Sequence, residues 1–131
     1  MNPVSEDIKD MIEAESSLGL TFGEDLFIGH EPATPANTVT IYDTAGYRPQ
    51  LTMDRSEIYE YPSIQIRVRN VSYQEGWDLI NDIKNSLHGR AHETWNETYY
   101  SVIRCSSDIA LVDWDNSKRA RFVVNFDVQR R

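Results

Sequence analysis

Residues 61–89 constrain the fold of this chain most, because a strand pattern passes directly into a helix pattern there. Polar residues alternate with three branched aliphatic residues, Ile64, Ile66 and Val68. A period of two places these aliphatic side chains on one face of a sheet and the polar ones on the other. The first half of this stretch is therefore predicted to be a half-buried strand.

A helix is predicted to follow, and it opens with a capping signal. Ser72 stands three residues before Glu75, so its hydroxyl can accept from the Glu75 amide while the carboxylate reaches back to the Ser72 amide. The apolar residues then recur at spacings of three and four: Tyr73, Trp77, Ile80, Ile83 and Leu87. Gly89 supplies the C-terminal stop. We predict that Trp77, Ile80, Ile83 and Leu87 pack this helix onto the preceding strand.

Size and composition favour one domain, residues 1–131, with one core, since 40% of the 131 residues are hydrophobic. The single cysteine, Cys105, cannot form an intramolecular disulfide. No apolar run approaches the ~18 residues that span a membrane, and the first residues lack the pattern of a signal peptide. The protein is expected to work in a reducing cytosol or in a particle assembled there.

The net charge of −8 is unevenly distributed. Residues 1–60 hold twelve acidic residues and three basic ones, whereas residues 61–131 are nearly balanced. Attraction to phosphates supplies most non-specific affinity for nucleic acid, so this acidic half argues against sequence-specific DNA binding. The alternatives are a solvated acidic face and a surface selected not to bind nucleic acid.

The remaining patterns predict a first helix over residues 5–17, with Ser5 as N-cap and Gly19 in its C-terminal turn. Five further strands are predicted at residues 26–30, 38–43, 98–105, 109–114 and 121–128. The last three form an antiparallel meander with turns at residues 106–108 and 115–118. Residues 44–55 lack periodicity and are interpreted as a long loop. The predicted fold class is α+β: a mostly antiparallel sheet of five to six strands with two main helices on one face.

Residues that could carry chemistry are few and dispersed. His88 and His92 are four residues apart, but Gly89 between them makes a shared helical face for zinc improbable. Cys105 lies in a predicted strand and is interpreted as a buried, inert thiol. Asp113 and Asp115 are assigned to a solvent-facing hairpin edge. No nucleotide-binding or hydrolase motif occurs in the sequence, so we expect no enzyme activity, no metal and no cofactor.

The run Tyr-Pro-Ser-Ile-Gln-Ile-Arg-Val-Arg at residues 61–69, followed by Tyr73, Gly76-Trp77-Asp78-Leu79-Ile80 and Leu87-His88-Gly89, resembles the minor capsid and tail terminator proteins of long-tailed bacteriophages. The predicted order of elements agrees with this family over most of the chain. The resemblance implies a structural virion protein, assembled in the host cytoplasm. Such proteins form a ring, usually hexameric, on the head-proximal end of the completed tail tube, stop its polymerisation and join it to the head.

The implied partners are copies of the same chain, the tail tube protein and a head-completion or connector protein, with genome DNA passing through unbound. We predict contacts between subunits or partners at Tyr47, Leu51, Arg55, Lys118, Arg119, Arg121 and Arg130. One alternative function is a head-completion or stopper protein of the neck. A small enzyme using His88, His92 or Asp113 and a small non-viral interaction domain are the others.

Overall fold

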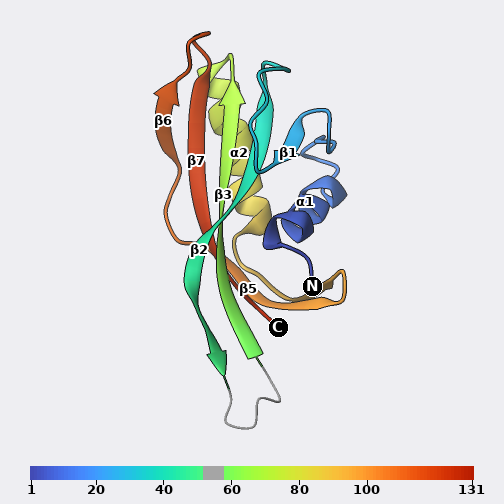
Figure 1. The fold of residues 1–131 in the computed structure, drawn as a ribbon. Helices are drawn as coiled ribbons and strands as arrows, with labels where there is room; N and C mark the ends of the chain where they lie inside the picture. The colour runs from blue at the N-terminus through green and yellow to red at the C-terminus, as the bar shows by residue number, and fades with distance from the viewer. Residues whose placement is uncertain (52–57) are drawn as a thin grey trace.

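The computed structural model describes residues 1–51 and 58–131, and shows there two helices packed against a curled sheet of seven strands (Figure 1). The predicted α+β class is confirmed, with one strand more than expected. The elements in chain order are α1 (Val4–Ala14), β1 (Leu26–Ile28), β2 (Thr38–Leu51), β3 (Ile58–Asn70), α2 (Tyr73–Leu87), β4 (Arg90–Trp95), β5 (Thr98–Cys105), β6 (Ala110–Trp114) and β7 (Ala120–Arg130).

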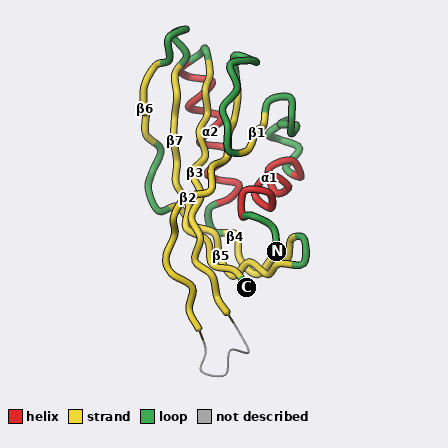
Figure 2. Tube along the Cα trace, viewed as in Figure 1, coloured by secondary structure: helices red, strands yellow, loops and turns green. Residues whose placement is uncertain are grey.

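The centre of the sheet is β3, which pairs antiparallel with β2 on one side and with β7 on the other. The strand order is β1-β2-β3-β7-β5-β4, and β6 also pairs with β7. Only β1 lies parallel to its neighbour, with Leu26 beside Val39 of β2, among the strands that the structure describes. Both helices contact the same side of this sheet (Figure 2).

The core forms where the helices meet the inner face of the sheet. The alternation predicted for β3 is confirmed, since Ile64, Ile66 and Val68 are each 0% exposed. Their partners in β7 have the same period and are equally buried: Phe126, Val124 and Phe122. Four residues of α2 are buried: Gly76, and as predicted Ile80, Ile83 and Leu87. The prediction that Trp77 belongs to the core is wrong, because Trp77 remains 39% exposed. Its ring contacts that of Phe122 in a T-shaped arrangement.

The N-terminal ends of both helices are capped differently from the sequence prediction. Ser72 accepts from the Glu75 amide at 3.3 Å as predicted, but its own amide donates to Asn70 Oδ1 at 2.8 Å and not to Glu75. Helix α1 begins one residue earlier than Ser5, and Ser5 is not its N-cap. The carboxylate of Asp43 in β2 accepts from the Ser5 amide at 3.0 Å, which places a negative charge at the positive end of α1.

The interpretation of residues 44–55 as a loop is wrong for the part that the structure describes. Strand β2 continues to Leu51, and the register shifts twice, between Thr44 and Tyr47 and between Tyr47 and Gln50. These irregularities break the period of two, so the sequence shows no strand pattern. Gly46 lies at the first shift, where a Cβ atom would be 2.0 Å from the Tyr61 carbonyl oxygen. Residues 52–57 lie outside the described part of the chain.

The predicted C-terminal meander is also wrong. Strands β5 and β6 do not pair with each other but share one edge of β7, β6 along its first residues and β5 along its last. Strand β4 was not expected and forms a hairpin with β5. The two-residue turn of this hairpin, Asn96-Glu97, has positive φ at both positions, as type I′ turns require. Asparagine and glutamate without glycine are a weak signal for such a turn, so the hairpin escaped prediction.

Candidate functional site

Three of the arginines predicted to contact other subunits are engaged within their own chain. Arg119 Nε lies 2.6 Å from Asp115 Oδ2. Arg121 Nε lies 3.2 Å from Asp113 Oδ1, an ion pair without hydrogen-bond geometry. Arg130, 8% exposed, has its Nε 3.0 Å from Glu60 Oε1. Their charges are thus matched locally, and a role between subunits stays a prediction.

The other predicted contact residues lie at two places on the surface. Tyr47 is 73% exposed, and its ring meets that of Tyr61 edge-on with centroids 6.4 Å apart. Lys118 is exposed in the turn between β6 and β7, where its φ is +62°. Leu51 is the last residue of β2, with its side chain outside the described part, and Arg55 is outside it altogether.

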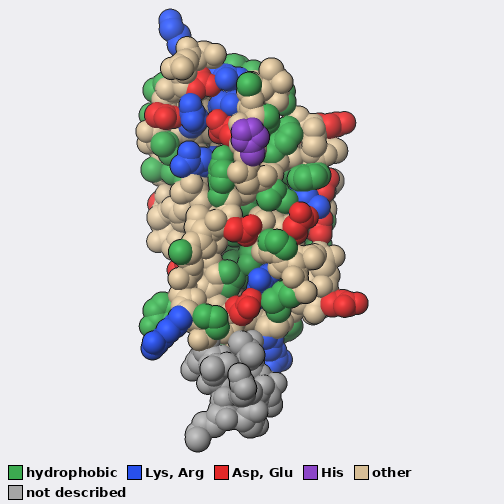
Figure 3. Space-filling model, in the orientation of Figure 1, with side chains coloured by type: hydrophobic (Ala, Val, Ile, Leu, Met, Phe, Trp, Pro, Cys, Tyr) green, Lys and Arg blue, Asp and Glu red, His purple; other side chains and the backbone are tan. Residues whose placement is uncertain are grey.

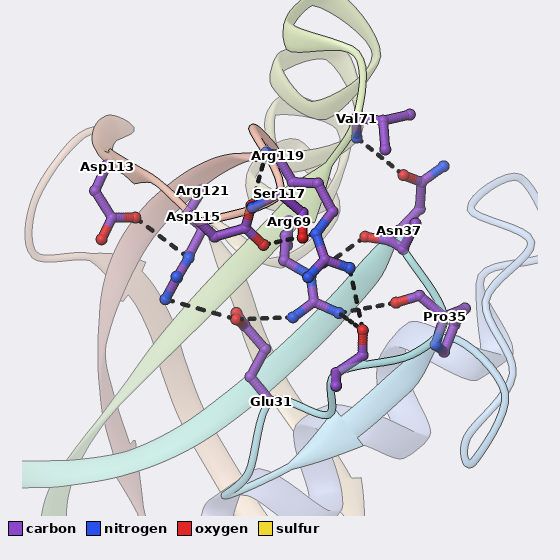
Figure 4. A network of polar contacts seen from close by, with 12 residues as sticks. Glu31, Pro35, Asn37, Arg69, Val71, Asp113, Asp115, Ser117, Arg119 and Arg121 are labelled. Atoms are coloured by element: carbon purple, nitrogen blue, oxygen red, sulfur yellow. Dashed lines mark hydrogen bonds and ion pairs between the residues drawn. The ribbon is translucent and has the colours of Figure 1, made fainter.

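A polar network fastens residues 31–37 to the outer face of the sheet (Figure 4). At its centre is Arg69 of β3, which is 3% exposed and has its Nη1 3.1 Å from Glu31 Oε1. Its remaining donors point to carbonyl oxygens of the connection, at 3.4, 2.8 and 3.2 Å for Ala33, Pro35 and Ala36. Figure 3 shows basic and acidic side chains gathered at the corresponding upper end of this face. The network is structural, because the guanidinium of Arg69 donates its hydrogen bonds to groups of the same chain.

A second buried network joins α1 to the β4–β5 hairpin. Tyr100 is 1% exposed and donates its hydroxyl hydrogen to Asp7, while Asn96 Nδ2 donates to Asp7 Oδ1 at 2.7 Å. Burial, reinforced by the bond to Asp7, raises the pKa of Tyr100 well above its ordinary value. The tyrosine is therefore a permanent donor to a buried carboxylate, and the hairpin that carries it closes over the first helix.

Replacing Tyr100 by phenylalanine is expected to lower the free energy of unfolding by about 1–3 kcal/mol, because a buried carboxylate loses a donor. Urea denaturation of the two proteins measures the difference. Tyr99→Phe is the matched control, since the neighbouring hydroxyl contacts His92 in an exposed setting. Equal losses in the two variants would contradict a special role for the buried pair.

The two histidines considered for chemistry have different partners in the structure. His88 Nδ1 accepts from the Cys105 amide at 2.9 Å, whereas His92 Nδ1 lies 2.6 Å from the Tyr99 hydroxyl. Cys105 is only partly buried, but burial raises the pKa of its thiol, so little thiolate forms near neutral pH. Within residues 1–51 and 58–131, no three side chains of the metal-binding types are grouped.

Two surface features of the described residues are candidates for contact with other proteins. The first, here called the sheet groove, is a hollow of about 460 Å³ on the outer face of the sheet. Tyr47, Tyr61, Ser63, Arg104 and Asp127 are among the residues that line it. Tyr47 and Tyr61 also line a second hollow together with Arg48, so the two are contiguous.

The second feature, here called the aromatic patch, consists of Tyr73, Trp77 and Trp114 over the buried ring of Phe122. The rings of Tyr73 and Trp114 stack with centroids 6.0 Å apart, and the Tyr73 edge meets Phe122 at 5.0 Å. The three rings are 47%, 39% and 50% exposed in sequence order. The patch was missed from the sequence because Trp77 has the spacing of a core residue and Trp114 is distant in the chain.

Comparison with known proteins identifies the family. A family model described as bacteriophage tail terminator protein matches residues 15–130. The chain belongs to this family. Its members are structural proteins of the virion tail, so this tail terminator family member is a tail component.

Other comparisons bear on the fold alone. No curated protein matches the chain. A chain from a solved structure, "Virion of native gene transfer agent (GTA) particle", is similar with a TM-score of 0.67 and 10% identity, over 98% of this chain and 94% of that chain. At this identity the likeness shows a shared fold. Within the described residues of this tail terminator family member, no helix is long and apolar enough to cross a membrane.

For a tail protein, the functional sites are its contacts with other proteins. The sheet groove lies on the outer face, and the aromatic patch lies at the N-terminal end of α2 beside β6. Hot spots in protein interfaces are rich in tryptophan, tyrosine and arginine. The groove exposes Tyr47 and Arg104, and the patch exposes one tyrosine and two tryptophans. They are therefore the candidate sites of this tail terminator family member.

Proposed function

We propose that the protein forms a closed ring of six copies on the head-proximal end of the tail tube, ends its polymerisation and joins the tail to the head. The match to tail terminators across residues 15–130 carries this proposal. A single domain closes a ring when two different surfaces meet head to tail under a fixed rotation. The sheet groove and the aromatic patch lie on different faces, so the domain can provide two such surfaces.

The proposed ring has the tail tube protein on one side and a head-completion or connector protein on the other. Genome DNA passes through its centre without sequence-specific binding. The net charge of −8 supports this, because acidic side chains repel phosphates and supply none of the electrostatic affinity on which DNA binding depends.

The test combines a mass measurement with a tube assembly assay. Native mass spectrometry of the purified protein should give a mass close to six times the 15.2 kDa of one chain. When it is added to polymerising tail tube protein, electron micrographs should show shorter tubes with a ring at one end. Tubes of unchanged length with bare ends would contradict the proposal, and binding to the connector alone would favour the stopper of the neck.

A further inference from the structure

We propose that the aromatic patch of one copy docks into the sheet groove of the next, and that this heterologous contact builds the ring. The proposal rests on the ring function above and names the two surfaces that meet. Its partner is therefore a second copy of this chain.

The patch has the composition of an interface centre. Large aromatic side chains bury much area and lose little conformational entropy when they are fixed in a contact. Three such rings stand together, and the apolar side chains of Val71, Leu111 and Val112 are also exposed nearby in the chain, at 57%, 41% and 44%. Strand β6 is exposed along its whole length, so its outer edge is open to a partner. Exposed apolar clusters of this kind mark contact sites on soluble proteins.

The groove provides complementary chemistry. Arg104 lines the groove, and Arg48 lines the hollow that shares Tyr47 and Tyr61 with it. Both arginines are exposed, and neither forms an ion pair or a hydrogen bond with any described residue. Arginine is the preferred cationic partner of a tryptophan ring face, and this cation–π attraction is strongest where water is excluded. The two exposed tryptophans and the two unmatched arginines therefore fit each other across a contact.

Charge supports the same pairing. Glu75 and Asp78 are exposed on α2 between and beside the rings of the patch, and no described cation pairs with either. These carboxylates would meet Arg104 and Arg48 when the patch enters the groove. The reverse arrangement, patch against patch, brings the acids of both copies together and is disfavoured by like-charge repulsion. A head-to-tail contact is thus favoured over a two-fold one.

Patch and groove lie on opposite faces of the domain, so they are two different surfaces, as a head-to-tail contact requires. The aromatic rings belong to the helical face, where Tyr73 and Trp77 begin α2, whereas Ser63 and Asp127 of the groove belong to the outer face. The groove cannot therefore be filled by the patch of the same copy. Each copy uses both surfaces, one for each neighbour.

Two variants, each damaged at one surface, test the proposal. Arg104→Glu reverses a charge in the groove and leaves the patch intact, while Asp78→Arg does the opposite. Each alone should raise the concentration needed for assembly by about tenfold or more, as expected for charge reversal in an interface. Arg67→Glu, on the same outer face but outside the groove, is the matched control and should assemble as the native chain does. Circular dichroism verifies that each variant is folded.

Mixing and combining the two variants distinguishes the outcomes. A mixture should form rings in which the two variants alternate, because each contact then joins either the two native charges or the two reversed ones. A chain carrying both changes should regain rings for the same reason. Rings that persist in both single variants would overturn the proposed contact and leave the ring function standing. A native chain that stays monomeric at all concentrations and does not cap tubes would overturn the ring function and this contact together.

Discussion

Replacing Arg69 by methionine is expected to lower the free energy of unfolding by about 3–5 kcal/mol, the cost of removing one partner from a buried ion pair. The guanidinium holds Glu31 and three carbonyl oxygens of residues 31–37. Without it, Arg121, at 3.7 Å, is the one cation left beside Glu31 among the described residues. The carbonyl oxygens of Pro35 and Ala36 lose this donor, while that of Ala33 keeps Arg119. Urea denaturation at a fixed protein concentration measures the change, since self-association adds to apparent stability.

Arg67→Met is the control for this prediction. Arg67 lies two residues away on the same face of β3, where it contacts Gln65 and the ring of Tyr42 but no carboxylate. Its loss should cost less than about 1 kcal/mol, because Arg67 is only half-buried and forms no ion pair with a described residue. If Arg69→Met also lowers the free energy of unfolding by less than about 1 kcal/mol, residues 31–37 are held in place by other contacts. Arg69→Lys should recover only part of the stability, because an ammonium cannot fork across several carbonyl groups.

Replacing Leu87 by alanine is expected to cost about 2–5 kcal/mol through lost transfer free energy and the cavity left behind. The side chain is 0% exposed in the last turn of α2 and belongs to the central core cluster. The same denaturant experiment measures it, with an unchanged slope as the sign that the folded state is otherwise intact.

Asn85→Ala serves as the control, since Asn85 is exposed in the same turn. That change should stay within about 0.5 kcal/mol, with a small gain possible because alanine favours helix. A loss below about 1 kcal/mol for Leu87→Ala would show that the end of α2 is not packed as described.

Local patterns were sufficient to predict the parts of the fold in which one face is buried without interruption. The strand around Ile64 and the helix ending at Leu87 follow periods of two and 3.6, because their inward positions are apolar and most of their outward ones are polar. The prediction that Gly89 ends this helix is also confirmed, since Gly89 adopts φ of +90°, which few other residues tolerate. The family resemblance rested on this same stretch and was confirmed by the match over residues 15–130.

Long-range pairing was decided by the tertiary structure alone. The extension of β2 to Leu51 depends on register shifts that allow it to stay paired with β3. The pairing of both β5 and β6 with β7 depends on contacts between distant segments. Neither feature produces a local sequence pattern.

The candidate sites show the same division. From the sequence, Arg119, Arg121 and Arg130 were predicted to contact other subunits or partners, but the fold places an acidic side chain of the same chain beside each. The largest separation is 90 residues, between Glu31 and Arg121. Conversely, Tyr73, Trp77 and Trp114 are separate in the chain and become one patch only when β6 lies beside the start of α2. The sequence determined which residues could be buried or charged. Which of them remained exposed and unmatched was determined by contacts between distant segments, because only the folded chain brings those partners together.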